Sequence, residues 1–153
     1  MMLAVGAELV IAGAEGERTV PAAEFFRGVF ETAVGPAELL TEIRVPKLGT
    51  WTGWSYLKFT RRAQDWATVG VAALVRNEHD ASVQEARIAL TNMGATPLRA
   101  TAAEQALVAG ESDPAAHMAE GTDPASDVSA SAEFRSHLAR VMGKRAIEEA
   151  LSR

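Results

Sequence analysis

The residues best suited to chemistry lie in the segment 51–68, WTGWSYLKFTRRAQDWAT. If this segment begins as a β-strand, the two-residue period places Trp54, Tyr56 and Lys58 on one face. An arginine pair and an Asp-Trp pair follow directly. Two aromatic rings and a lysine on one sheet face would suit a flat ligand with polar edges. The simpler alternative is an aromatic–cation group on a solvated sheet face.

Other chemistries find less support in the sequence. The histidines His79, His117 and His137 have no i,i+4 spacing and no HExxH motif, so we expect no metal site. A GxSxG motif is absent, and zero cysteines exclude a cysteine nucleophile and Fe–S ligation by this chain. We assign no catalytic residue.

The composition limits the class of partner and compartment. A net charge of −5 argues against nucleic acid, whose binding depends on basic patches. The N-terminal residues lack the basic start of a signal peptide, and we expect no transmembrane segment, because no apolar run approaches the ~20 residues that span a bilayer. Together with the absence of cysteine, these features favour a cytoplasmic protein.

The first third of the chain reads as short strands. Residues 8–12 and 17–20 form a predicted hairpin around a Gly-Ala-Glu-Gly turn, and Pro21 opens a short helix. The next strand, 39–45, ends at Pro46. Its alternation places Leu40 in register with Glu42 and Arg44, which is unusual for an apolar side chain.

The remainder predicts an antiparallel sheet followed by helices. Strands are expected at 53–61, 68–76 and 83–92, with the second strand central because it is apolar on both faces. Leu57 and Phe59 should point under the helices. The helices are expected to begin at a Thr101–Glu104 capping box, at Pro114 and at Ser131. The fold class is therefore α+β, a three- to four-stranded antiparallel sheet packed against about three helices.

Several sequence blocks in this order resemble one family. GWSYLKFTRRAQDWATVGVAALV, ARIALTNMGATPLRATAAEQAL and SDVSASAEFRSHLARVMGKRAIEEAL resemble the C-terminal part of the FAD-binding (medium) subunit of molybdenum hydroxylases, the carbon monoxide and xanthine dehydrogenase family. The preceding GERTVPAAEFFRGVFETAVGPAELLTEIRVP resembles the end of the FAD-binding domain of the same subunit. The resemblance implies two domains, a flavin-domain remnant at 1–46 and a C-terminal domain at 47–153.

The resemblance also implies a function and two site residues. In such enzymes substrate is oxidised at a molybdenum cofactor on a large subunit. Electrons pass through two [2Fe–2S] clusters on a small subunit to FAD, and then to an external acceptor. The leucine of an LLxxI strand and the lysine of a YxK strand contact the isoalloxazine ring, which implies that Leu40 and Lys58 bind cofactor here.

One departure from the family pattern concerns the flavin phosphates. In the family, glycine-rich loops in the first half of the subunit hold the FAD pyrophosphate, whereas the 12 glycines here include no Gly-Gly pair and no GxGxxG. We therefore expect a C-terminal portion of the subunit that binds FAD poorly by itself. The alternative is an interaction module that kept the fold without flavin binding.

Overall fold

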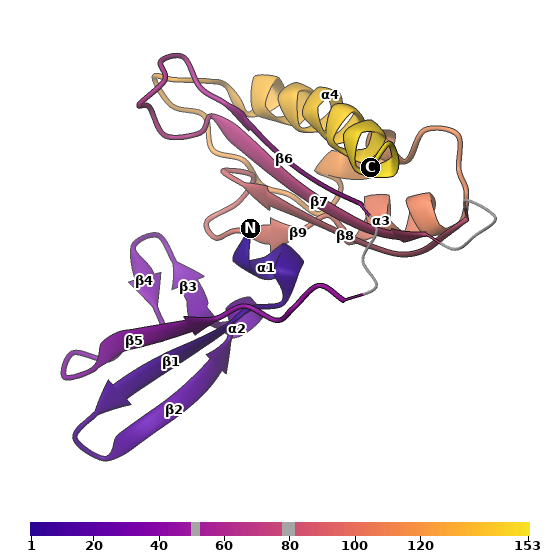
Figure 1. The fold of residues 1–153 in the computed structure, drawn as a ribbon. Coiled ribbons are helices and arrows are strands. Elements are labelled where there is room, and N and C mark those ends of the chain that lie inside the picture. Colours follow the sequence, from indigo (N-terminus) through magenta and orange to yellow (C-terminus); the bar gives the residue numbers. More distant parts are fainter. Residues whose placement is uncertain (50–52, 78–81) are drawn as a thin grey trace.

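The computed structural model describes residues 1–49, 53–77 and 82–153, which form two units (Figure 1). The N-terminal unit, residues 1–49, contains α1 (Met2–Val5), β1 (Glu8–Gly13), β2 (Gly16–Pro21), α2 (Ala22–Phe25), β3 (Phe26–Gly28), β4 (Glu31–Thr32) and β5 (Leu39–Arg44). The C-terminal unit, residues 53–153, contains β6 (Gly53–Phe59), β7 (Val69–Asn77), β8 (Val83–Thr91), β9 (Leu98–Arg99), α3 (Thr101–Val108), the 3₁₀ helix η1 (Pro114–Ala119) and α4 (Ala132–Leu151).

The N-terminal unit contains a three-stranded sheet in the order β2-β1-β5. The predicted hairpin is confirmed: β1 and β2 pair antiparallel, and the turn closes at Gly16, whose φ of 117° favours glycine. Strand β5 pairs with β1 on the other side, and all six of its residues are exposed.

A bulge in β5 corrects the predicted face of Leu40. The register shifts between Val10 and Ile11, so that Leu40 lies opposite Ile11 and Ile43 lies opposite Leu9. Because cross-strand partners share a face, Leu40 lies on the same face as Ile43 and not with the charged residues of the strand. The sequence alone placed Leu40 with Glu42 and Arg44 because the two-residue period of a regular strand was applied across the bulge.

The turn before β5 is held by a charged pair. Arg18 donates from Nε and Nη2 to the two carboxylate oxygens of Glu38, at 2.9 and 2.7 Å. The amide of Gly35 donates to the same carboxylate at 2.7 Å. The pKa of Glu38 is consequently lowered to about 2, chiefly by the hydrogen bond from Arg18. This pair ties the start of β5 to β2.

The C-terminal unit has a four-stranded antiparallel sheet in the order β6-β7-β8-β9. As predicted, β7 lies in the interior of this sheet, and its residues Val69–Val75 are buried on both faces. Helices α3, η1 and α4 cover one face, with α4 lying along β6 and β7 (Figure 1). The core between them is aliphatic and includes Val71, Ile88, Leu90 and Met118.

Two details explain how the helices pack. A Cβ at Gly53 would overlap the carbonyl of Ala150, so glycine lets α4 approach β6 closely. The predicted capping box at Thr101 is wrong, because Glu104 is buried and turns toward the sheet. Its carboxylate accepts from the Ile88 amide at 2.6 Å and from Arg99 at 2.5 and 2.8 Å.

The opposite face of this sheet meets the N-terminal unit. Ala72, Leu74 and Ala89 belong to a second buried cluster together with residues of α1 and β1 such as Val5 and Leu9. Helix α1 contacts β7, β8 and β9. The predicted α+β class, with a three- to four-stranded antiparallel sheet packed against about three helices, is thus confirmed. In the described residues, no helix is both long and apolar enough to cross a bilayer.

Candidate functional site

The predicted aromatic–lysine face lies on β6, on the side of the sheet away from the helices. Trp54 and Tyr56 are 50% and 44% exposed, and Lys58 is also exposed. On the opposite face Leu57 packs against the core. Phe59 departs from prediction: it contacts Phe134 of α4 edge-to-face, with ring centroids 6.2 Å apart, but is 37% exposed. The alternation of side chains along β6 is as predicted, but Phe59 at the end of the strand is more exposed than predicted.

On this face, Gly70 of β7 lies between Lys58 of β6 and Thr91 of β8. Gly70 of β7 pairs with Lys58 on one side and with Thr91 of β8 on the other. A Cβ at Gly70 would lie 2.8 Å from Thr91 Oγ1 and 3.7 Å from the Tyr56 hydroxyl oxygen. A side chain at Gly70 would therefore crowd the Thr91 hydroxyl group, and glycine avoids this contact.

The ammonium group of Lys58 contacts the loop that follows its own strand. Lys58 Nζ donates to the Asp65 carbonyl at 3.4 Å. The loop, residues 60–68, is closed where the Thr68 amide donates to the Phe59 carbonyl at 2.8 Å. The loop thus returns to β6 next to the lysine, and its Asp65 carbonyl accepts the hydrogen bond from the ammonium group.

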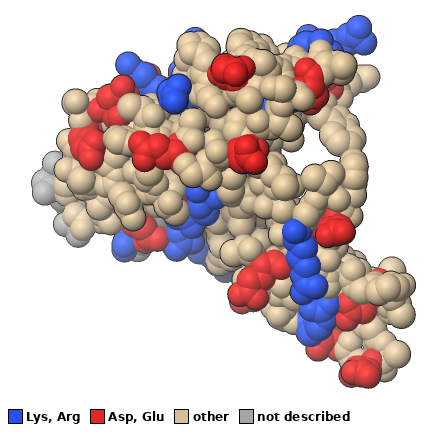
Figure 2. Space-filling view, turned by 180° about the vertical axis from the view of Figure 1, so that it is seen from behind, with Lys and Arg blue, Asp and Glu red and all other residues tan. Residues whose placement is uncertain are grey.

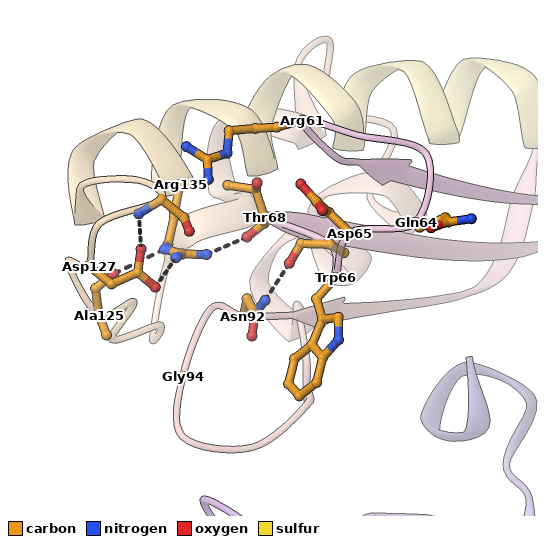
Figure 3. Close-up of a pocket in the computed structure, with 12 residues that line it drawn as sticks. Arg61, Gln64, Asp65, Trp66, Thr68, Asn92, Gly94, Ala125, Asp127 and Arg135 are labelled. Carbon is orange, nitrogen blue, oxygen red and sulfur yellow. Dashed lines mark hydrogen bonds and ion pairs between the residues drawn. The ribbon is translucent and has the colours of Figure 1, made fainter.

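A polar pocket of about 570 Å³ lies at this end of the sheet (Figure 3). Three loops form it: residues 60–68, the turn after β8, and the loop before α4. Its lining residues include Arg61, Asp65, Trp66, Asn92 and Arg135. Trp66 is 82% exposed and extends away from the other labelled side chains in Figure 3. Lys58 is outside this lining and is linked to it by the Asp65 carbonyl.

The base of the pocket is an ion pair. Arg135 of α4 is buried and bonds to Asp127 Oδ2 at 2.7 Å. Asp127 also accepts from the amides of Ser129 and Ala130, at 2.8 and 3.0 Å. These amides are the largest influence on the pKa of Asp127, which is lowered, and Arg135 adds to the effect. Asp127 is therefore an ionised partner for Arg135 at neutral pH.

The two residues expected to contact flavin lie on different sheets. Leu40 is 41% exposed on the edge strand β5, and Lys58 is exposed on the edge strand β6, the next strand in the chain. Neither belongs to the lining of the 570 Å³ pocket. Within the described residues, no cluster of three or more His, Cys, Asp or Glu side chains could hold a metal ion.

Sequence reasoning missed Arg135, Asp127 and Asn92. Ser131 caps α4 as predicted, accepting from the Phe134 amide, but an arginine one turn into a helix is ordinarily solvated. A usable signal was the Asp-x-Ser-Ala stretch at 127–130, which is typical of an aspartate bonded to amides ahead of a helix. Figure 2 shows acidic and basic side chains interspersed over both units on the face it draws.

Comparison with protein families gives two adjacent matches. Residues 54–150 match the CO dehydrogenase flavoprotein C-terminal domain, and residues 1–48 match the FAD binding domain in molybdopterin dehydrogenase. Among curated proteins, the carbon monoxide dehydrogenase medium chain of Hydrogenophaga pseudoflava is 37% identical over all of this chain and 55% of its own length. The caffeine dehydrogenase subunit beta of a Pseudomonas species is 38% identical over 54% of its length.

Solved structures agree with these matches. A carbon monoxide dehydrogenase from Hydrogenophaga pseudoflava superimposes with a TM-score of 0.91 and 38% identity, covering 99% of this chain and 54% of that one. Quinoline 2-oxidoreductase from Pseudomonas putida superimposes with a TM-score of 0.88 and 28% identity, over the same shares. The chain spans about half the length of the curated relatives it matches. It belongs to the family of the CO dehydrogenase flavoprotein C-terminal domain, preceded by sequence of the FAD-binding domain of molybdopterin dehydrogenases.

Proposed function

We propose that this chain works as part of the FAD-binding, electron-transferring medium subunit of a molybdenum hydroxylase. Its partners would be a molybdenum-binding large subunit and a small subunit carrying two [2Fe–2S] clusters. The observation that carries the proposal is the exposed Tyr56–Lys58 face, which lies on the YxK strand of a chain belonging to this family. The domains we propose are residues 1–46 and 47–153.

The residues present suit the ring of FAD. The flavin would supply two-electron chemistry, receiving electrons from the iron–sulfur clusters and releasing them to an external acceptor. Lys58 would place its ammonium group at the pyrimidine edge, where a positive charge stabilises the negative charge that reduction creates. Leu40, exposed on β5, would cover one face of the ring and exclude water from it.

The same residues do not suit the pyrophosphate of FAD. Phosphate groups need a run of free backbone amides that approach closely without Cβ atoms between them. The described glycines with positive φ are Gly6, Gly16, Gly49, Gly110 and Gly121, and each stands alone in its turn. We therefore propose that the phosphate contacts come from the flavin-domain sequence that relatives possess beyond the half matched here.

This division predicts the behaviour of the purified 153-residue chain. We expect it to bind FAD more weakly than about 1 μM, or about −8 kcal/mol, and to elute from gel filtration without flavin absorbance. A yellow protein with stoichiometric FAD would contradict the division. The rival function, an interaction module without flavin chemistry, is supported by the same absence of glycine loops and also predicts a colourless chain.

A chimera separates the two functions. The chain would be joined to the non-matching half of the Hydrogenophaga pseudoflava medium chain and assembled with the large and small subunits of that enzyme. If our proposal is correct, the complex binds FAD, and carbon monoxide bleaches the flavin absorbance. An assembled complex that lacks FAD, or whose bound FAD stays oxidised while the iron–sulfur clusters are reduced, would instead support the interaction module.

A further inference from the structure

We propose that Arg135 is a positioning residue that fixes the 60–68 loop and, through the Asp65 carbonyl, the ammonium group of Lys58. The proposal concerns the geometry of this chain alone. Only its consequence for flavin rests on the function proposed above.

Arg135 is 4% exposed, and each of its three nitrogens bonds to a different acceptor. Nη1 donates to the Thr68 carbonyl at 2.5 Å, and Nε donates to the Ala125 carbonyl at 3.0 Å. Nη2 pairs with Asp127 at 2.7 Å. One side chain therefore joins α4 to the end of the 60–68 loop and to the loop before the helix (Figure 3).

A second contact holds the same end of the loop. Asn92, which adopts a left-handed conformation with φ of 57°, donates from its side-chain amide to the Ala67 carbonyl. The Thr68 amide meanwhile donates to Phe59. The peptide units at 67 and 68 are thus held from β6, from the turn after β8 and from α4. The Asp65 carbonyl, which accepts the hydrogen bond from the Lys58 ammonium group, lies two residues before Ala67, where the anchored peptide units begin.

The chemistry of the contact requires arginine. Its acceptors lie in three directions around a planar group, which matches the fixed fork of a guanidinium. A lysine could keep the positive charge beside Asp127 and bond to one or two of these oxygens, but could not bond to all three acceptors at once. Removing the charge altogether would leave Asp127 without its cation and the Thr68 carbonyl without its donor.

The test uses the full chain without flavin, in four forms: wild type, Arg135→Met, Arg135→Lys and the control Arg140→Met. Arg140 is exposed on the same helix. Hydrogen–deuterium exchange would follow peptides that contain Thr68. Mass spectrometry would then compare the acylation rate of Lys58 with those of Lys47 and Lys144, which serve as internal references.

We expect Arg135→Met to speed exchange at Thr68 about tenfold and to raise Lys58 acylation relative to both reference lysines. Arg135→Lys should give intermediate values, and Arg140→Met should match wild type. Should Arg135→Met fail to fold, Arg135→Lys decides the question by itself. Unchanged Thr68 exchange and Lys58 acylation in the folded variants would overturn the proposal. Acylation that rises equally at all three lysines would also overturn it, because it would report general loosening.

These readouts stay separate from the flavin proposal. If Lys58 proved irrelevant to FAD, the exchange and acylation results on the flavin-free chain would be unaffected. If Arg135 proved irrelevant to Lys58, the effect of Lys58 on a bound flavin would remain to be measured on its own.

Discussion

Strands β7 and β5, one in each unit, differ in how far their residues are exposed. In the C-terminal unit, β7 is buried on both faces between neighbouring strands, helices and the N-terminal unit. In the N-terminal unit, β5 is exposed at all six positions, and Phe30 at the β3–β4 turn is 92% exposed. Exposed apolar side chains contribute surface rather than core. Strand β7 therefore contributes to the core, and β5 contributes surface.

The sharpest test of this contrast compares two leucines on strands. Leu90 of β8 is 0% exposed, whereas Leu40 of β5 is 41% exposed. We expect Leu90→Ala to lower the free energy of unfolding by about 2–5 kcal/mol, because it leaves a cavity in the core. Leu40→Ala should cost less than about 1 kcal/mol. Urea titration of both variants measures the difference.

Similar losses in the free energy of unfolding for Leu90→Ala and Leu40→Ala would contradict the contrast between a buried strand and an exposed one. They would mean that β5 is covered in solution, and sedimentation would then show whether copies of the chain associate.

Two phenylalanines provide a smaller contrast. Phe59 keeps an edge-to-face contact with Phe134 but is partly exposed, so Phe59→Ala should cost about 1–2 kcal/mol instead of the larger loss of a fully buried ring. Phe30→Ala should change stability by less than about 0.5 kcal/mol. A loss of more than about 3 kcal/mol for Phe59→Ala would show that the ring is buried in solution.

Two charged contacts, one in each unit, should respond to pH in opposite directions. The pKa of Glu38 is lowered to about 2, so the stabilisation from its Arg18 pair is present above pH 4.5 and is lost as pH falls toward 2. The pKa of His117 is raised by hydrogen bonds with Glu120 and Glu111, so that stabilisation is present below pH 6.5 and is lost as pH rises.

Melting temperatures measured across pH would check these signs. Glu38→Gln should remove part of the acid-side decline, and His117→Gln part of the decline above pH 6.5. His137→Gln, an exposed substitution on α4, serves as the control. A His117→Gln profile that parallels wild type would show that the pairs with the two glutamates do not form in solution.

The elements could be predicted from sequence wherever the signal was local. The apolar run of β7, the Gly13–Gly16 turn of the first hairpin and the Ser131 cap all depend on neighbouring residues. The α+β class followed from their order. The alternating face of β6 was also predicted, because no irregularity interrupts its pairing with β7.

What the sequence could not predict depends on distant contacts. The predicted face of Leu40 was wrong because the position of the bulge depends on how β1 pairs with β5. Glu104 fits a capping box by spacing but instead accepts from Ile88 and Arg99. Arg135 bonds to a carbonyl 67 residues earlier in the chain, a contact that no local pattern encodes.

The measurement that tests the account most directly is the midpoint potential of FAD in the chimeric complex with Lys58→Met. If Lys58 lies at the ring edge, losing its charge makes the flavin harder to reduce. One charge at an effective dielectric of about 20 is worth a few kcal/mol at most, and about 30 mV corresponds to about 1.4 kcal/mol for a two-electron couple. We predict a potential lower by some tens of millivolts, with no change for Lys144→Met. An unaltered potential with FAD fully bound would contradict the account and leave Lys58 as part of a solvated sheet face.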